Sequence, residues 1–227
     1  MSSIKFNCLY LLDPSGFEGA TFKQEWLAFF DPSIFNSGYI QGFEYYMAVD
    51  PNISDNPESD RCAIVTIAFD RPRGDIYVLD IFAEPMDWPT QMKKIIDYAR
   101  RTRLPFIPRD VSIRRVGIES NTWQQVVSKG AYAAGLPIKE IKQKQTKHER
   151  LVGIQPHFES GRFKFPDLKF GVNWWDKFEV EYLSYPLGKY KDIMDGIELA
   201  FTTAEVSEPS GGPNFAFGNV PKWGGMR

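Results

Sequence analysis

The feature that most constrains the fold is a set of three β-rich segments that follow one another along the chain. FEYYMAVD (43–50), RCAIVTIAFD (61–70) and DIYVLDIFA (75–83) are rich in β-branched and aromatic residues. The link PNISDNPESD contains proline and asparagine residues that do not continue a strand, and RPRG is typical of a hairpin turn. The pattern therefore predicts an antiparallel meander of three strands.

Helices and strands alternate after the meander. TQMKKIIDYARRTR, which follows Pro89, has apolar residues at the i, i+3, i+4, i+7 spacing of an amphipathic helix. The remaining elements are expected to be strands at 111–120 and 137–143, helices at 121–135, 146–158 and 189–203, and a small hairpin at 158–165. This order predicts the α/β, ribonuclease H-like fold, in which a mixed β-sheet is flanked by helices.

Some of these helices have recognisable ends. Asn121 is a candidate N-cap and Gly135 a candidate C-terminal stop for the helix at 121–135. Thr146 and Glu149 have the spacing of a capping box at the next helix. Pro156 is expected to end or kink that helix.

The domain organisation follows from length and composition. The chain has 227 residues, of which 43% are hydrophobic, so it is able to bury a core. We expect a lead-in segment at 1–40 with one candidate helix at 18–30, a ribonuclease H-like α/β domain at 41–203, and a flexible tail at 204–227 that is rich in Gly, Pro and Asn.

Several classes of protein are disfavoured. The longest apolar runs, such as CAIVTIAF (62–69), fall short of the roughly 18 to 20 residues of a membrane span, and the N-terminus makes a poor signal peptide. Cys8 and Cys62 predict neither a disulfide framework nor a zinc site, and His148 and His157 are the chain's two histidines. We therefore expect a cytoplasmic protein, not secreted and without a membrane partner.

Charge is distributed unevenly along the chain. Residues 1–60 carry nine acids against two lysines, whereas residues 89–115 carry eight basic residues against two acids. Residues 139–150 add five basic residues against two acids. A basic middle opposite acidic clusters is compatible with phosphate binding beside a metal site, and equally with a pair of solvated helix faces.

Four acids are candidates for catalysis because of where they fall. Asp50 ends the first strand of the meander and Glu119 ends the fourth strand. Asp192 and Asp195 lie three apart at the start of the last helix, so they share a face near the positive end of the helix dipole. Ends of adjacent strands bring side chains from distant sequence positions together, so we expect these carboxylates to converge.

Clustered carboxylates repel one another unless a cation lies among them. Two Mg²⁺ or Mn²⁺ ions, which prefer oxygen ligands, activate water and stabilise the leaving oxygen of a phosphodiester without a protein nucleophile. Taken singly, each acid has a structural alternative: Asp50 before Pro51 as a turn former, the others as helix-start residues. Their joint placement favours the metal site.

Four blocks of sequence resemble the nuclease domain of the large terminase subunit of tailed bacteriophages. The resemblance covers about residues 6–202, and its blocks are AVDPNISDNPESDRCAIVTIAFD, VGIESNTWQQ, KQTKHERLVGIQPHFESGRFKF and YPLGKYKDIMDGI. The resemblance implies metal-binding catalytic acids at Asp50, Glu119, and Asp192 with Asp195. Lys191 stands where the family usually has an acid, so the choice between Asp192 and Asp195 as direct ligand is left open.

The resemblance also implies further site residues. Asp60 is expected either to tie down the loop after Asp50 or to assist the metal site. Lys147 and Arg150 match a family pattern and are expected either to contact DNA phosphate or to hold neighbouring acids. Other candidate DNA-binding residues, taken from the basic segments, are Arg114, Arg115, Lys93 and Lys94.

The implied activity is endonucleolytic cleavage of double-stranded viral DNA, with little sequence preference, during genome packaging in the host cytoplasm. Implied partners are the terminase ATPase domain or chain, the phage portal or procapsid, and the small terminase subunit. No P-loop motif occurs in the chain, so we expect no ATP hydrolysis from it alone. The sequence leaves two alternatives open: a junction-resolvase or transposase-like nuclease of the same fold, and a non-catalytic portal or procapsid docking module.

Overall fold

One mixed sheet forms the centre of the molecule. The computed structural model describes residues 21–36, 42–51, 61–120, 124–167 and 171–206. In these residues seven strands pair in the order β1-β7-β4-β3-β2-β5-β6. The strands are β1 (Ala28–Phe30), β2 (Phe43–Asp50), β3 (Cys62–Asp70), β4 (Asp75–Glu84), β5 (Arg115–Glu119), β6 (Ile138–Ile141) and β7 (Phe163–Pro166). The helices are α2 (Trp88–Ala99), α3 (Gln124–Ala133), α4 (Lys147–Glu159), α5 (Trp175–Ser184) and α6 (Asp192–Glu205), with short 3-10 turns at Gln24–Trp26 and Pro32–Asn36.

The predicted meander is confirmed. β2 pairs antiparallel with β3, and β3 pairs antiparallel with β4, while β5 and β6 continue the sheet parallel to β2. Gly74 closes the turn after β3 with a positive φ and donates its N–H to the carbonyl of Asp70. The ribonuclease H-like arrangement expected from the order of elements is therefore present.

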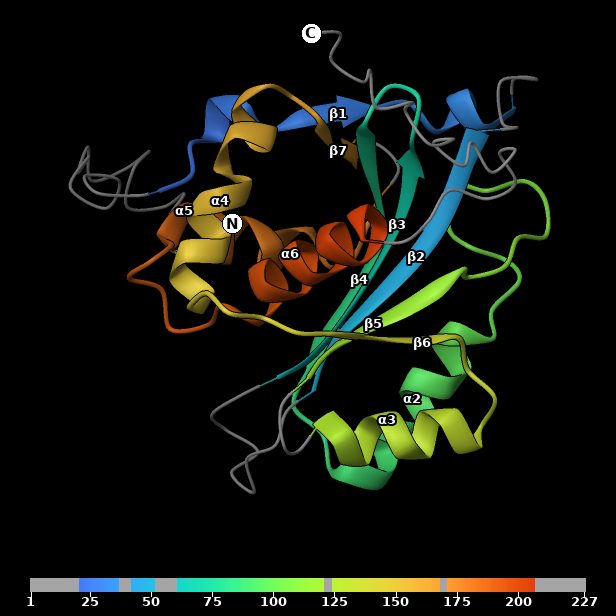
Figure 1. The fold of residues 1–227 in the computed structure, drawn as a ribbon. Coiled ribbons are helices and arrows are strands. Elements are labelled where there is room, and N and C mark those ends of the chain that lie inside the picture. The colour runs from blue at the N-terminus through green and yellow to red at the C-terminus, as the bar shows by residue number, and fades with distance from the viewer. Residues whose placement is uncertain (1–20, 37–41, 52–60, 121–123, 168–170, 207–227) are drawn as a thin grey trace, which may run out of the picture.

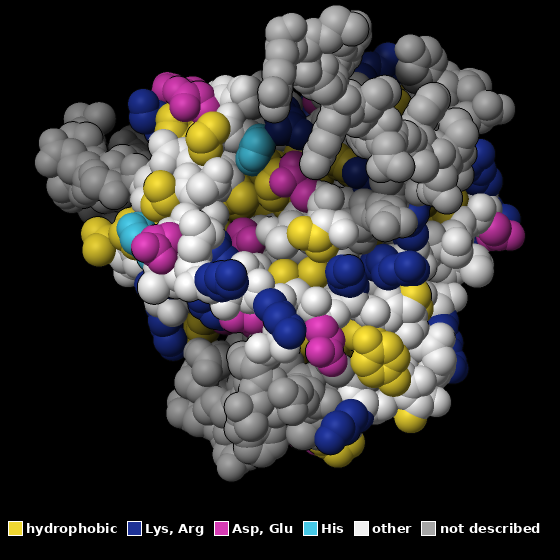
Figure 2. All heavy atoms as spheres, viewed as in Figure 1, with side chains coloured by type: hydrophobic (Ala, Val, Ile, Leu, Met, Phe, Trp, Pro, Cys, Tyr) yellow, Lys and Arg dark blue, Asp and Glu magenta, His cyan; other side chains and the backbone are white. Residues whose placement is uncertain are grey.

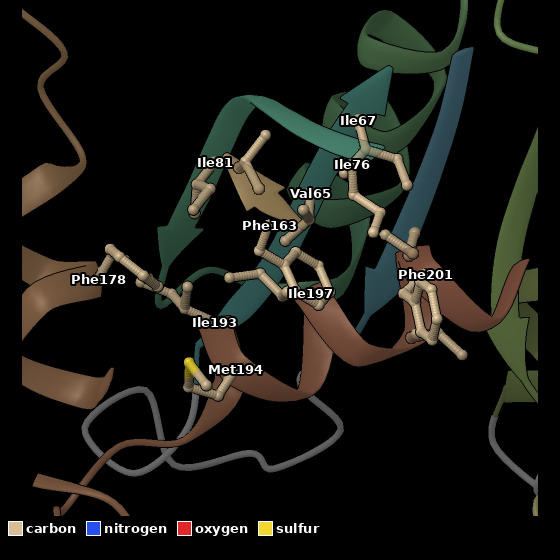
Figure 3. Packing of buried hydrophobic residues seen from close by; sticks show 14 of the residues in the cluster. Val65, Ile67, Ile76, Ile81, Phe163, Phe178, Ile193, Met194, Ile197 and Phe201 are labelled. Atoms are coloured by element: carbon tan, nitrogen blue, oxygen red, sulfur yellow. The ribbon is translucent and has the colours of Figure 1, made fainter. Parts of the chain in front are cut away.

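Helices cover both faces of the sheet (Figure 1). Side chains of α4, α5 and α6 join one buried cluster with residues of the meander and β7, whereas α2 and α3 join a second cluster. Figure 3 shows α6 lying along the first face, with Ile193, Met194, Ile197 and Phe201 among the labelled side chains of the first cluster. Residues of β2 alternate between the two clusters, with Tyr46 and Ala48 toward α6 and Met47 and Val49 toward the other face.

The predicted helix ends are partly confirmed. Thr146 and Glu149 form the capping box of α4, and Gly135 follows α3 with a positive φ. Asn121 lies outside the described residues. Of the two outcomes expected for Pro156, an end to the helix at that residue is excluded, because α4 continues to Glu159.

Two predictions about elements are wrong, and one helix was not predicted. The segment predicted to be a helix at 18–30 contains a 3-10 turn and the edge strand β1 in its described part. The segment 158–165 is not a hairpin but the end of α4 followed by β7, which runs parallel to β4 and β1. Helix α5 was not predicted, because the buried acids Glu179 and Glu181 interrupt its apolar stripe.

The proposed boundaries at residues 40 and 203 stay predictions. The described part of the lead-in nevertheless packs on the same sheet, since Phe22, Phe30 and Phe35 are buried. Across the described residues, every helix falls short of the length and apolarity that crossing a bilayer requires.

Candidate metal centre

Two glycines let α6 lie unusually close to the sheet. A Cβ at Gly117 of β5 would lie 1.8 Å from Oγ1 of Thr203, and a Cβ at Gly196 of α6 would lie 2.8 Å from Cγ2 of Val65. Neither distance is possible between real side chains, so both positions require glycine for this approach. The close contact places the first turn of α6 over the ends of β2 and β3.

Asp50 and Asp195 meet at a single ammonium group. Lys147, the first residue of α4, places its Nζ 3.1 Å from Oδ2 of Asp50 and 2.9 Å from Oδ2 of Asp195. The two carboxylate oxygens are therefore no further apart than the sum of these distances. The side chains of Asp50 and Asp195 are 13% and 8% exposed, whereas that of Lys147 is 53% exposed. The lysine thus covers the two acids from the solvent side.

The protonation equilibria of this pair follow from burial and charge. Burial raises the pKa of the Asp50 carboxyl above its ordinary value; Lys147 opposes this shift and Asp195 adds to it. Burial alone would lower the pKa of Lys147, but the carboxylates of Asp50 and Asp195 outweigh it and raise that pKa. Lys147 is therefore a firmly charged counter-ion at neutral pH.

Glu119 lies beside a second ion pair. Arg150, which is 4% exposed, contacts Oε2 of Glu198 through Nη1 at 2.5 Å and Oε2 of Glu119 through Nη2 at 3.4 Å. Glu198 is also 4% exposed and accepts a hydrogen bond from Oγ1 of Thr202. Burial raises the pKa of Glu198, while the hydrogen bond from Thr202 and the charge of Arg150 oppose the rise. Arg150 thus links β5 to α6 through α4.

Asp192 lies toward the start of β3. Its Oδ2 accepts a hydrogen bond from the backbone N–H of Arg61 at 3.4 Å. The neighbouring Glu181 of α5 accepts from the N–H of Ile193 and from Nη1 of Arg61. Burial raises the pKa of Glu181 to about 7, an effect that the charge of Asp192 reinforces and that Arg61 and the N–H of Ile193 oppose. Asp192 therefore lies near Arg61 and Glu181, one turn of α6 before Asp195.

Three charged residues of this region were not predicted from the sequence: Arg61, Glu181 and Glu198. Glu198 left a signal, because it follows Asp195 by three residues and so shares its face of α6. Arg61 and Glu181 carry no such signal in the sequence, because they come together only when α5 packs beside the start of β3.

The donor atoms suit a hard divalent cation. Asp50, Glu119 and Asp195 supply oxygens only, which Mg²⁺ and Mn²⁺ prefer. An ammonium ion already lies between Asp50 and Asp195, so that position accepts positive charge. Within the described ranges, no three His, Cys, Asp or Glu side chains form a group that could hold a metal ion as they stand. The residues fit a cation between Asp50 and Asp195, and Arg150 contacts Glu119 beside them.

The candidate DNA-binding residues are placed differently from one another. Lys147 and Arg150 hold acids, which is one of the two roles expected, and the burial of Arg150 excludes direct contact with phosphate in this state. Arg114 pairs with Glu44, and Arg115 lies four residues from Glu119, about 13 Å along the strand. Both arginines lie at the opposite end of β5 from Glu119, and their assignment as DNA-binding residues stays a prediction.

The predicted basic helix after Pro89 lies on the other face of the sheet from α6. Lys93 and Lys94 belong to α2, which packs on the face of the sheet opposite α6. The expectation that they contact DNA at this site is therefore not supported by their placement. Asp60, the other predicted residue, lies outside the described residues.

A family model now identifies the fold. The model described as the terminase RNaseH-like domain matches residues 47–184, which is more than half of the chain and runs from within β2 to the end of α5. The chain belongs to this family. The resemblance to terminase nuclease domains inferred from the four sequence blocks is thereby confirmed. A comparison with curated protein sequences gives no match.

Solved structures similar to this terminase-family domain include nuclease domains from two phages and a herpesvirus. The phage P22 large terminase nuclease domain has a TM-score of 0.58 at 12% identity, covering 84% of this chain and 94% of its own. The human cytomegalovirus terminase nuclease domain has a TM-score of 0.56 at 11% identity, covering 82% and 96%. The large terminase nuclease of thermophilic phage G20c with bound magnesium has a TM-score of 0.53 at 14% identity, covering 81% and 96%. At these identities the likeness establishes the fold.

Proposed function

We propose that this terminase-family domain is a metal-dependent endonuclease that cleaves double-stranded viral DNA, with little sequence preference, during genome packaging. The observation that carries the proposal is the convergence of Asp50 and Asp195, from a strand and a helix far apart in sequence, on one cation position beside Glu119. The bound magnesium of the G20c nuclease supports the choice of metal class.

The chain's own groups account for the chemistry. Asp50, Asp195 and Glu119 offer oxygen ligands at one edge of the sheet, and a bound pair of Mg²⁺ or Mn²⁺ ions would there activate water and stabilise the leaving 3′ oxygen. We assign Asp195 as the direct ligand of the last helix because it shares the counter-ion of Asp50. Asp192 is assigned to an outer position, since its carboxylate accepts the N–H of Arg61.

Basic side chains near the acids suit a phosphate backbone. Figure 2 shows Lys and Arg side chains gathered along the connection between β6 and α4, which leads to Lys147. Lys142 and Lys144 of this connection are exposed. Contacts to phosphate carry no sequence information, which is consistent with cutting without sequence preference.

The proposed setting is the host cytoplasm during virus assembly. The terminase ATPase domain or chain would supply translocation, because this chain has no P-loop motif. A large terminase from another thermophilic bacteriophage matches this chain over 44% of its own length, which leaves room in that protein for such a domain. The portal or procapsid and the small terminase subunit are the other proposed partners.

Cleavage of supercoiled plasmid tests the proposal. We expect nicking and linearisation with Mg²⁺ or Mn²⁺ and none in excess chelator. Asp50→Asn, Glu119→Gln and Asp195→Asn should each lower the cutting rate by about a hundredfold or more, because each removes a charged oxygen ligand. Asp97→Asn, an exposed acid on α2, is the matched control and should cut normally. Undiminished cutting in chelator, or by Asp50→Asn, would refute the assignment.

A further inference from the structure

Lys147 holds the position that a cation must take. Its ammonium lies within 3.1 Å of one carboxylate oxygen on each of Asp50 and Asp195, and those same oxygens are the ligands assigned above. A divalent ion and the ammonium cannot both occupy the space between two carboxylates this close together. Binding of the ion therefore requires the lysine to leave.

The local structure permits that departure. Lys147 is the first residue of α4, and the capping box of Thr146 and Glu149 fixes the backbone on which it stands. Its side chain is 53% exposed, so a rotation about its own bonds carries the ammonium into solvent without moving the helix. Arg150 has no such freedom, because it is 4% exposed and pairs with Glu119 and Glu198.

We propose that Lys147 is a positioning residue that serves as a built-in counter-ion for Asp50 and Asp195, competes with the divalent cation, and is drawn away by a DNA phosphate. The inference rests on the proposed function. A phosphate arriving over the β6–α4 connection offers the ammonium an alternative partner at the N-terminus of α4. DNA binding and cation binding then strengthen each other, since each removes the obstacle to the other.

This role differs from a purely structural one in the sign of a measurable effect. If Lys147 only braced the acids, its removal would loosen the site and leave cation affinity unchanged or weaker. If it competes with the cation, its removal must tighten cation binding while destabilising the cation-free protein, because Asp50 and Asp195 then repel each other uncompensated.

Calorimetric titration of the full chain with Ca²⁺ distinguishes the two roles. Ca²⁺ is used as an oxygen-seeking probe under conditions that suppress cutting. We expect Lys147→Gln and Lys147→Met to bind Ca²⁺ about tenfold more tightly than the wild type and to melt earlier without Ca²⁺. Lys93→Gln, which removes an exposed charge on the other face of the sheet, should match the wild type in both respects.

The coupling to DNA is measured in the same titration with a saturating short duplex. We expect the duplex to tighten Ca²⁺ binding to the wild type by about fivefold or more, within the usual range of coupling between sites, and by clearly less in Lys147→Gln. If Lys147→Gln does not fold without Ca²⁺, the dependence of the melting temperature on Ca²⁺ concentration replaces calorimetry for both proteins. A higher Ca²⁺ concentration for the half-maximal effect in Lys147→Gln than in the wild type would overturn the proposal.

The outcomes separate this inference from the proposed function. Unchanged or weaker Ca²⁺ affinity in both Lys147 variants, with Asp50→Asn abolishing Ca²⁺ binding, overturns the role of Lys147 alone. Identical Ca²⁺ binding by the wild type and Asp50→Asn overturns both, because the cation would then bind elsewhere.

Discussion

Replacing Arg150 with methionine tests how the site is held together. Methionine preserves much of the aliphatic stem of Arg150 but removes the guanidinium that bridges Glu119 and Glu198. The loss of the guanidinium would affect the two glutamate carboxylates differently. Glu119 is 21% exposed and regains water, whereas Glu198 is 4% exposed and keeps the hydrogen bond from Thr202.

The size of the effect follows from this difference. Removing one partner of a buried ion pair costs about 3–5 kcal/mol, because the remaining charge is left uncompensated. We expect Arg150→Met to lose about 3 kcal/mol of unfolding free energy at pH 8. This value is at the lower end of the range because Thr202 still donates a hydrogen bond to Glu198. Arg103→Met is the matched control: its partner Asp110 is 65% exposed, so its loss should stay below about 1 kcal/mol.

The pH dependence carries the decisive sign. The pKa of Glu198 is already raised by burial, and removal of Arg150 raises it further. A raised folded-state pKa means that the protonated form is favoured on folding, so stability falls as pH rises through that pKa. Urea unfolding should therefore show a larger loss for Arg150→Met at pH 8 than at pH 5. A loss below about 1 kcal/mol, or one independent of pH, would refute the account.

The other predictions concern the close approach of α6, the helix α4 and the buried acid of α5. Gly117→Ala should destabilise the domain by about 2–3 kcal/mol or more in urea unfolding, because the added Cβ would overlap Thr203. Gly153→Ala, a helical site with nothing within 4 Å, should stabilise it by about 0.5–1 kcal/mol, and a loss there would contradict the geometry. Burial raises the pKa of Glu181 from 4.5 to about 7, so the stability of the domain in chelator should fall as pH rises from 4.5 through 7. Glu181→Gln should make stability less dependent on pH over this range, and an unchanged dependence would contradict the role of Glu181.

The fold could be predicted where its signals are local. The meander is joined by short connections, and each of its strands carries its own β pattern, so neighbouring segments in sequence became neighbours in the sheet. The strand β7 is four residues long and pairs with β4 and β1 from distant parts of the chain. Nothing within Phe163–Pro166 specifies those partners, which is why a local hairpin was the expected outcome.

In the candidate site, too, the features with a local sequence signal could be predicted and those set by tertiary packing could not. The positions of Asp50 and Glu119 follow from the end of a strand, a feature that the sequence pattern marks directly. The partners of Lys147 and Arg150 depend on how α4 packs beside α6, and the capping residues of α4 do not determine that packing. Both roles for these residues were expected, and only the tertiary arrangement distinguishes them.

The pairing of β1 with β7 bears on how the domain can be produced as a shortened protein. β1 covers the outer edge of β7, and Phe22 packs its ring against Phe158 and Tyr182. A chain trimmed to begin at residue 41 would expose a row of unpaired N–H and C=O groups and leave a hole lined by aromatic rings. Open strand edges of this kind recruit other chains, so such a fragment would aggregate. A soluble fragment must begin upstream of Thr21, whose N–H donates to the carbonyl of Tyr185.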